Sequence, residues 1–201
     1  MKKISFVIPC YGSEHTIENV VDEIRQTVTK RSEYDYEIIL VNDYSPDHVW
    51  DKITELTRED PHVKGLFLAK NFGQHSALMA GYRESDGDIV ISLDDDGQTP
   101  VGMVWDFYDK MQEGYDVVCA KYTETTQKSA ANKQHSGFRN FGSKINDYMC
   151  DILLNKPRGL MVTSYFAARR FVIDEVCRYQ NPYTYVIGLI FRTTKNIGTV
   201  S

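Results

Sequence analysis

Residues 88–98 read Asp88-Ile-Val-Ile-Ser-Leu-Asp94-Asp95-Asp96-Gly97-Gln98, a short apolar run that ends in three consecutive carboxylates. The run has the length and the β-branched composition of a buried strand. Similar runs occur at 4–8, 37–41, 64–69 and 116–120, and helical patterns lie between them, as at 17–28 and 100–111. This alternation predicts an α/β fold with a mainly parallel, Rossmann-like sheet flanked by helices. Ligands should bind at the carboxyl ends of its strands.

The composition is that of one globular domain. The chain has 201 residues, of which 42% are hydrophobic and 25% charged, enough for a single well-filled core. Its four cysteines are scattered without a Cys-x-x-Cys pair, which argues against a disulfide framework or a zinc site. The first strand-like run starts at residue 4, too early for the apolar stretch of a signal peptide, so we expect none, and no apolar run approaches the roughly 18 residues of a membrane span. We expect a cytoplasmic domain, truncated on an unfinished strand, with any transmembrane segment beyond residue 201.

Charge is divided unevenly along the chain. Residues 1–120 hold 11 Lys and Arg against 23 Asp and Glu, whereas residues 121–201 hold 12 against 5. Either half can be a solvated surface, and the basic half can equally be a face that meets an anionic partner. Both interpretations stay open on charge alone. We expect no nucleic-acid partner, and self-association stays open.

The three aspartates are the strongest chemical signal. Carboxylates gathered at a ligand-binding edge repel one another unless a cation or hydrogen-bond donors neutralise them. Asp94 and Asp96 point the same way if the strand continues, and with Gln98 they offer the hard oxygen ligands that Mg²⁺ or Mn²⁺ prefers. The alternative is an acidic turn that stays solvated. Their place at the end of a strand favours the metal.

Two other strand ends narrow the ligand. The second strand ends in Asp43, where a carboxylate commonly meets a ribose hydroxyl or a base N–H, although residues 42–47 also suit an ordinary turn or helix cap. The first turn, residues 9–14, has one glycine where a dinucleotide fold needs G-x-G-x-x-G, and no P-loop motif occurs. Dehydrogenases and P-loop NTPases are therefore disfavoured. A metal at Asp94 and Asp96 would supply the missing counter-charge for a nucleoside diphosphate.

Four segments together carry a family resemblance. Residues 8–14, 41–47, 70–74 and 94–100 follow the order and spacing of the family-two glycosyltransferases, which have a GT-A type fold. Residues 70–74, Lys-Asn-Phe-Gly-Gln, and the Asp-x-Asp-x-Gln form are most similar to the dolichol-phosphate mannose synthase and polyprenyl-phosphate glycosyltransferase branch. Three positions depart from the pattern: Asn42 and Tyr44 stand where the family has aspartate and glycine, and Lys70 stands where the branch has arginine.

The resemblance implies a role for each matching residue. The donor would be a UDP- or GDP-sugar, bound by Pro9, Tyr11, Glu14, Asp43, Lys70, Asp94 and Asp95. The metal would be held by Asp94, Asp96 and Gln98. Catalysis, with inversion at the sugar, would rest on Asp94, Asp95 and Asp96.

The acceptor side follows from the basic residues of the second half. Lys121 and the Arg139-x-x-x-Ser143 spacing match the lipid-phosphate branch, and Arg139 and Ser143 share one helix face. A phosphate acceptor is already an anion and needs cations more than a general base. No Asp or Glu lies between Ile152 and Ile173. We therefore expect transfer to a polyprenyl phosphate at the inner face of an anionic membrane.

The organisation follows this division of labour. Residues 1–121 are predicted to bind the nucleotide sugar and metal, and residues 122–201 to be the acceptor half of the same catalytic domain. In the latter we expect a polar loop at 122–135, a helix at 137–154, a strand at 162–166 and a helix at 170–179. Arg169 and Arg170 are expected to cap a helix or face lipid headgroups.

Three alternatives remain open from sequence. The acceptor can be a saccharide hydroxyl, with Asp95 as the general base. A nucleotidyltransferase also uses acidic metal sites on α/β sheets, but residues 9–14 lack its glycine-rich, lysine-containing loop. The third is a non-catalytic sugar-nucleotide or protein-binding module.

Overall fold

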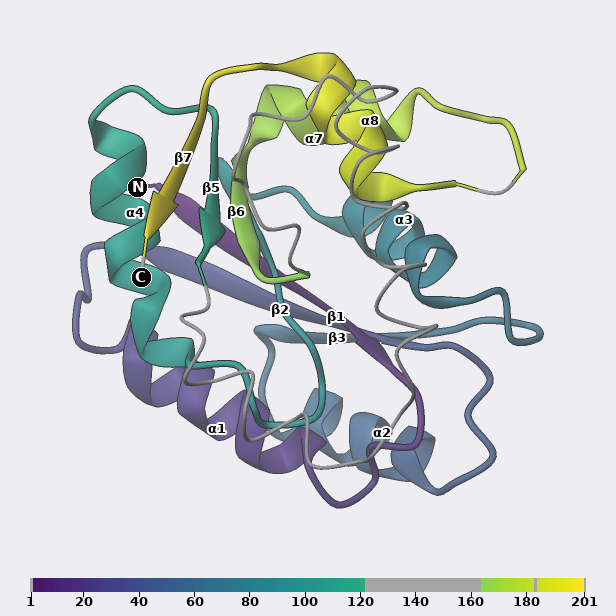
Figure 1. Cartoon of the computed structure of the whole chain (residues 1–201). Coiled ribbons are helices and arrows are strands. Elements are labelled where there is room, and N and C mark those ends of the chain that lie inside the picture. Colours follow the sequence, from purple (N-terminus) through teal and green to yellow (C-terminus); the bar gives the residue numbers. More distant parts are fainter. Residues whose placement is uncertain (1, 122–163, 183, 201) are drawn as a thin grey trace, which may run out of the picture.

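The computed structural model describes residues 2–121, 164–182 and 184–200 (Figure 1). Its centre is a seven-stranded sheet of order β3-β2-β1-β4-β6-β5-β7. The strands are β1 (Lys3–Cys10), β2 (Asp35–Asn42), β3 (Val63–Phe67), β4 (Ile89–Ser92), β5 (Val117–Ala120), β6 (Phe166–Arg169) and β7 (Ile197–Val200). All neighbouring pairs are parallel except those of β6, which runs antiparallel to both β4 and β5. The predicted mainly parallel α/β sheet is confirmed.

Helices cover both faces of this sheet (Figure 1). One face carries α1 (Ile17–Val28), α2 (Val49–Glu59) and α4 (Val104–Gln112), the last preceded by the 3-10 turn η1 (Val101–Met103). The other face carries α3 (Gln74–Glu84), α7 (Arg170–Cys177) and α8 (Val186–Thr193). Alternation along β1 feeds both layers: Phe6 and Ile8 pack on the first and Val7 on the second.

The first helix, α1, forms where the apolar residues of the sequence recur at helical spacing. Its apolar residues lie at helical spacing on one face, and all are at most 4% exposed: Ile17, Val20, Val21, Ile24 and Val28. Full burial of one such side chain stabilises the fold by about 1.5–3 kcal/mol. The pattern after Pro100 gives η1 and α4 in the same way. Both predicted helices are confirmed.

The sequence placed the strand of the second half too early. It was predicted at 162–166, but β6 begins at Phe166 and ends at Arg169, and residues 162–163 lie outside the described residues. An arginine fits the end of this strand because backbone carbonyls satisfy its guanidinium. Arg169 Nη2 donates to Met111 O at 2.6 Å, near the end of α4, and Nε to Tyr115 O at 2.9 Å.

The helices of the second half agree only in part with the prediction. The helix expected at 170–179 is α7, and Arg170 at its start donates to Gly87 O at 2.8 Å. Both arginines therefore bind backbone carbonyl oxygens, but only Met111 O, which Arg169 binds, lies in the last turn of a helix. Helix α8 was not predicted. The loop expected at 122–135 and the helix expected at 137–154 lie outside the described residues.

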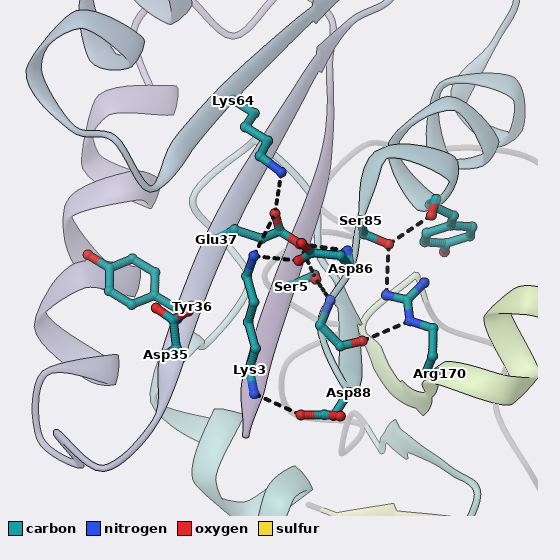
Figure 2. Close-up of polar contacts among 12 residues, drawn as sticks. Lys3, Ser5, Asp35, Tyr36, Glu37, Lys64, Ser85, Asp86, Asp88 and Arg170 are labelled. Atoms are coloured by element: carbon teal, nitrogen blue, oxygen red, sulfur yellow. Dashed lines mark hydrogen bonds and ion pairs between the residues drawn. The ribbon is translucent and has the colours of Figure 1, made fainter. Parts of the chain in front are cut away.

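At the amino ends of the strands, Glu37 is buried in a charged cluster (Figure 2). Its side chain is 2% exposed, and Oε1 accepts from Ser5 Oγ at 2.6 Å and from Asp86 N at 2.8 Å. Oε2 lies 2.7 Å from Lys64 Nζ and 3.3 Å from Lys3 Nζ. These five residues form the amino-edge cluster, which links β1, β2 and β3 to the turn before β4.

Hydrogen bonds decide the charge state of that buried carboxyl group. Burial alone would raise the pKa of Glu37, but the bonds from Asp86 N–H, Lys64 and Ser5 outweigh it and lower the pKa to about 2. The turn also requires a glycine at 87, since a Cβ there would lie 2.6 Å from Ser5 Oγ and 2.8 Å from Ser5 N. The sequence analysis predicted Glu37 only as a residue of the second strand.

Within residues 2–121, 164–182 and 184–200, no helix has both the length and the apolar character needed to cross a bilayer.

Candidate functional site

A cavity of about 460 Å³ opens at the carboxyl ends of β1, β2 and β4. Most of its lining comes from the ends of these strands and from the loop between β3 and α3, and Ser164 is added from the second half of the chain. The lining residues are Pro9, Cys10, Tyr11, Asp43, Asn71, Gly73, Gln74, Asp94, Asp95, Asp96 and Ser164. Carboxyl ends of parallel strands meet at one edge of a sheet. For that reason, side chains predicted from three separate motifs converge on one cavity.

Neutral donors hold Asp94 at the lining of this cavity. Its Oδ1 accepts from Gln74 Nε2 at 3.0 Å, and its Oδ2 accepts from Ser164 Oγ. Burial raises the pKa of Asp94, and the nearby charge of Asp96 adds to the increase, against the hydrogen bonds from Ser164 and Gln74. Neither Gln74 nor Ser164 was predicted to be a site residue, although Gln74 closes the quoted 70–74 segment.

Asp95 faces the first loop. Its Oδ2 accepts from Tyr11 N at 2.9 Å, and its backbone carbonyl accepts from Thr16 Oγ1 at 2.6 Å. Burial raises the pKa of Asp95 despite the hydrogen bond from Tyr11. The carboxylate therefore ties the acidic segment to the turn that follows β1.

Asp96 reaches the cavity through a turn. Asp94 and Asp96 were expected to point the same way if the strand continued through them. Strand β4 instead ends at Ser92, before both residues. Gly97 adopts φ 70°, and Asp96 Oδ1 accepts from Gln98 N at 2.9 Å. The side chain of Gln98 is exposed and does not line the cavity. The turn, rather than the pleat, brings Asp94 and Asp96 together.

The acidic group lacks a cationic partner in the described part of the chain. No lysine, arginine or histidine there forms an ion pair with Asp94, Asp95 or Asp96. Nor do the described residues hold a group of three or more His, Cys, Asp or Glu side chains arranged for a metal. Two carboxylates with hard oxygen atoms and an unmet need for positive charge fit a divalent cation that completes its shell with diphosphate oxygens. The set of Asp94, Asp96 and Gln98 stays a prediction.

Asp43 shapes the β3–α3 loop. The residue is 3% exposed, and its two oxygens accept from Phe72 N at 2.7 Å and from Gly73 N at 2.8 Å. Gly73 adopts φ 86°, a conformation that favours glycine. The predicted contact of Asp43 with base or ribose would use the remaining lone pairs of a carboxylate already anchored in the protein.

The motif after β2 supports the first loop from outside the cavity. Ser45 Oγ accepts from Gly12 N at 2.8 Å, and Asp47 Oδ2 accepts from Glu14 N at 2.9 Å. Glu14 returns the contact through Oε2, which accepts from His48 N at 2.8 Å. Glu14 therefore does not line the cavity, and its predicted contact with the nucleotide stays a prediction.

Tyr44 occupies a backbone position that suits glycine. Its φ is 55°, in the left-handed region, which costs a side-chain-bearing residue about 1–2 kcal/mol. The ring is exposed and packs edge-on against Phe67, with centroids 6.0 Å apart. Tyr44 therefore adopts a backbone conformation that favours glycine, the residue expected at this position from the resemblance.

The remaining predicted cations lie beside the cavity or outside the described residues. Lys70 is exposed, with Nζ 4.9 Å from the centroid of the Phe72 ring, and lines a neighbouring groove of about 830 Å³. Lys121 is exposed at the end of β5, where its backbone N–H donates to Val200 O at 2.7 Å. Arg139 and Ser143 lie outside the described residues.

Comparison with known proteins gives one family and one fold. Residues 5–177 match the model of the family described as Glycosyl transferase family 2. The chain is 34% identical over 187 residues to the undecaprenyl-phosphate 4-deoxy-4-formamido-L-arabinose transferase of Proteus mirabilis (strain HI4320), covering 92% of this chain and 55% of that protein. The chain thus spans about half the length of this curated relative.

Two solved structures share the architecture. S. aureus TarS 1-349 in complex with UDP-GlcNAc has a TM-score of 0.66 at 17% identity, covering 100% of this chain and 56% of that one. Glucosyl-3-phosphoglycerate synthase from Mycobacterium tuberculosis, in complex with Mn²⁺, UDP and phosphoglyceric acid, also has a TM-score of 0.66, at 20% identity, covering 98% and 68%. The fold is of the GT-A type, as predicted.

Proposed function

Because this chain belongs to glycosyl transferase family 2, we propose that it moves a sugar from a nucleoside-diphosphate sugar to a polyprenyl phosphate. The observation that carries the proposal is the convergence of Tyr11, Asp43 and the three aspartates on one cavity at the carboxyl edge of the sheet. The arabinose transferase of Proteus mirabilis, named for undecaprenyl phosphate, supports this acceptor class.

The donor binds across the cavity. Of the residues that line it, Pro9, Tyr11 and Asp43 would contact the base and ribose, and Asp94, Asp95 and Asp96 would border the diphosphate. UDP in the solved structures of TarS and of the phosphoglycerate synthase supports a uridine donor over a guanosine donor. Glu14 and Lys70 act from the rim in this proposal, since neither lines the cavity itself.

A divalent cation completes the site. Asp94 and Asp96, with Gln98 from the rim, would hold Mg²⁺ or Mn²⁺, and the Mn²⁺ of the phosphoglycerate synthase structure supports the class of ion. When bound, the ion supplies positive charge for the diphosphate and for the leaving group. The hydrogen bonds from Gln74 and Ser164 keep Asp94 in place, and Tyr11 N–H keeps Asp95 turned toward the first loop.

The reaction is a displacement at the anomeric carbon. An oxygen of the lipid phosphate forms the new bond to that carbon, the bond from carbon to the β-phosphate oxygen breaks, and the nucleoside diphosphate leaves with the electron pair. A phosphate anion brings no proton that must be removed, so positioning by Lys121, Arg139 and Ser143 replaces a general base. Attack from the face opposite the leaving group inverts the sugar.

The deciding experiment is a donor screen with a short polyprenyl phosphate as acceptor. UDP- and GDP-sugars are supplied with Mg²⁺ or Mn²⁺, and both the released nucleoside diphosphate and the glycosylated lipid are measured. We expect lipid product with at least one UDP-sugar, only when metal is present. Release of diphosphate with saccharide acceptors, but never with polyprenyl phosphate, would contradict the proposed acceptor.

Arg139→Ala should impair use of the acceptor and spare the donor. The guanidinium can bind two phosphate oxygens at once, and a hydrogen bond to a charged group contributes about 1.5–3 kcal/mol. We expect the KM for polyprenyl phosphate to rise roughly 10- to 100-fold, with UDP affinity unchanged. Arg139→Lys should rescue only in part, because lysine keeps the charge and loses the fork.

The matched control for this experiment is Arg178→Ala. Arg178 is an exposed arginine at the end of α7 and pairs with Glu175 on its own helix. Its replacement should leave the KM of both substrates unchanged. Wild-type acceptor kinetics in Arg139→Ala would remove the main reason to prefer a lipid phosphate over a sugar hydroxyl.

A further inference from the structure

We infer that Gln74 is a positioning residue for Asp94, held in place by a turn that Asp43 anchors. The inference rests on the proposed function, since it explains how the carboxylate that faces the metal and diphosphate keeps its orientation. It also assigns a task to residues 71–74, the part of the Lys-Asn-Phe-Gly-Gln segment for which the sequence supplied a resemblance but no chemistry. We call residues 71–74 the positioning turn.

The positioning turn is fixed at its start by Asp43. Two consecutive backbone N–H groups, of Phe72 and Gly73, donate to the two oxygens of this one buried carboxylate at 2.7 and 2.8 Å. Hydrogen bonds to a charged acceptor are about twice as strong as those between neutral groups. The end of β2 therefore sets the path of the chain into α3.

Helix α3 fixes the other end of the positioning turn. Gln74 is its first residue, and Ala77 and Leu78, one turn later, are buried against the sheet. The N–H groups of Ser76 and Ala77 donate to Gly73 O at 2.9 and 3.1 Å. The backbone of Gln74 is thus held on both sides, so its side chain reaches Asp94 from a rigid base.

The chemistry of the side chain suits positioning. Asp94 is acceptor-only when ionised, so the amide nitrogen of Gln74 must face it, at the observed 3.0 Å. An amide directs the carboxylate without neutralising it, whereas a lysine or arginine there would supply the charge that the metal should bring. Ser164 Oγ, also neutral, takes the second oxygen. Each oxygen of Asp94 keeps a lone pair for a cation.

One alternative must be separated from this assignment. Gln74 lines the cavity, so it can contact the donor directly and lower affinity when replaced, without acting through Asp94. The two roles differ in one respect. A positioning residue matters only while Asp94 is present, whereas a donor contact matters with or without it.

The test is a double-mutant cycle on UDP affinity, measured by calorimetry with and without Mn²⁺. Gln74→Met keeps the length of the side chain and removes its donor group. We expect it to weaken Mn²⁺-dependent UDP binding roughly 10- to 100-fold, the usual effect of losing a partner of a metal ligand, and to leave metal-free binding unchanged. In an Asp94→Ala background the same replacement should cause no further loss.

Two further variants sharpen the cycle. Gln74→Glu places a second carboxylate against Asp94 and should weaken Mn²⁺-dependent binding at least as much as Gln74→Met. Gln180→Met, at a residue that lines the neighbouring groove but not the cavity, is the matched control and should bind UDP as the wild type does. Because Gln74 is exposed, we expect both Gln74 variants to melt at the wild-type temperature.

The outcomes separate this inference from the proposed function. Unchanged Mn²⁺-dependent binding in Gln74→Met, or a loss that persists in the Asp94→Ala background, overturns the positioning role while the wild type still binds UDP. A wild type that shows no Mn²⁺-dependent UDP binding overturns both. Failure of the wild type to glycosylate polyprenyl phosphate, with the cycle behaving as expected, overturns only the proposed acceptor.

Discussion

Asp96→Ala should lower the rate of sugar transfer by roughly 10²- to 10³-fold and leave the protein folded. The reason for the first effect is that a metal ion contributes several kcal/mol of charge stabilisation in such reactions, and each 1.36 kcal/mol is a factor of ten in rate. The reason for the second is that Asp96 is exposed and adds to the repulsion felt by Asp94. The rate of nucleoside diphosphate release and the melting temperature measure the two effects.

The matched control for this variant is Asp106→Ala. Asp106 is an exposed aspartate on α4 and does not line the cavity. Its replacement should change neither the rate nor the dependence on Mn²⁺. If Asp96→Ala retained wild-type transfer at saturating donor, the metal would have to be held without it, and the assignment would be wrong.

The sequence was sufficient for the local part of the fold. Each β-branched run of the first 120 residues became a strand, since such runs suit buried parallel strands irrespective of context. The position of β6 in the sheet could not be predicted from the sequence. An antiparallel strand between β4 and β5 is decided by contacts far apart in the chain, and Arg169 concealed the strand's true end.

The candidate site was also predictable only in part. Asp43 and Asp94 were found because they follow strands, and strand ends meet at one edge. Their partners were not, because Gln74 and Ser164 come from distant segments and lie in no strand. A side chain that positions another leaves no pattern of its own in a single sequence.

The carboxyl ends and the amino ends of the strands, here called the two edges of the sheet, have different roles. At the carboxyl edge, Asp94 is half-buried with neutral donors and without a cation in the described residues, which leaves it prepared for a ligand. At the amino edge, Glu37 is buried with Lys64 and Lys3 and with donors on both oxygens. A glutamate at the start of the apolar run 37–41 was the signal that could have revealed the second cluster. We expect the first edge to control activity and the second to control stability.

Glu37→Ala should lower the free energy of unfolding by about 3–5 kcal/mol, the usual cost of breaking a buried ion pair by removing one partner. The lost carboxylate leaves Ser5 Oγ, Asp86 N–H and two lysines without their shared acceptor. Urea unfolding measures the loss. Glu84→Ala, at an exposed position on α3, is the control and should unfold like the wild type. Transfer by the folded Glu37→Ala protein should stay unchanged, because the cluster lies at the opposite edge from the cavity.

The contribution of Glu37 should also depend on pH in a defined window. Its pKa is about 2 in the folded protein against an ordinary value of 4.5, so folding favours the ionised form. Stability from this group is therefore complete above pH 4.5 and is lost as pH falls toward 2, by about 1.4 kcal/mol per pH unit.

Other carboxyl groups with lowered pKa, such as those of Asp60 and Asp109, also weaken the wild type in acid. The comparison with Glu37→Gln isolates Glu37, because those groups are common to both proteins. We expect the gap in free energy of unfolding between wild type and Glu37→Gln to be constant from pH 7 to 5 and to narrow steadily from 4.5 to 3. A gap that stayed constant down to pH 3 would mean that folding does not favour the ionised form of Glu37, and its hydrogen bonds would then stabilise the sheet without the charge.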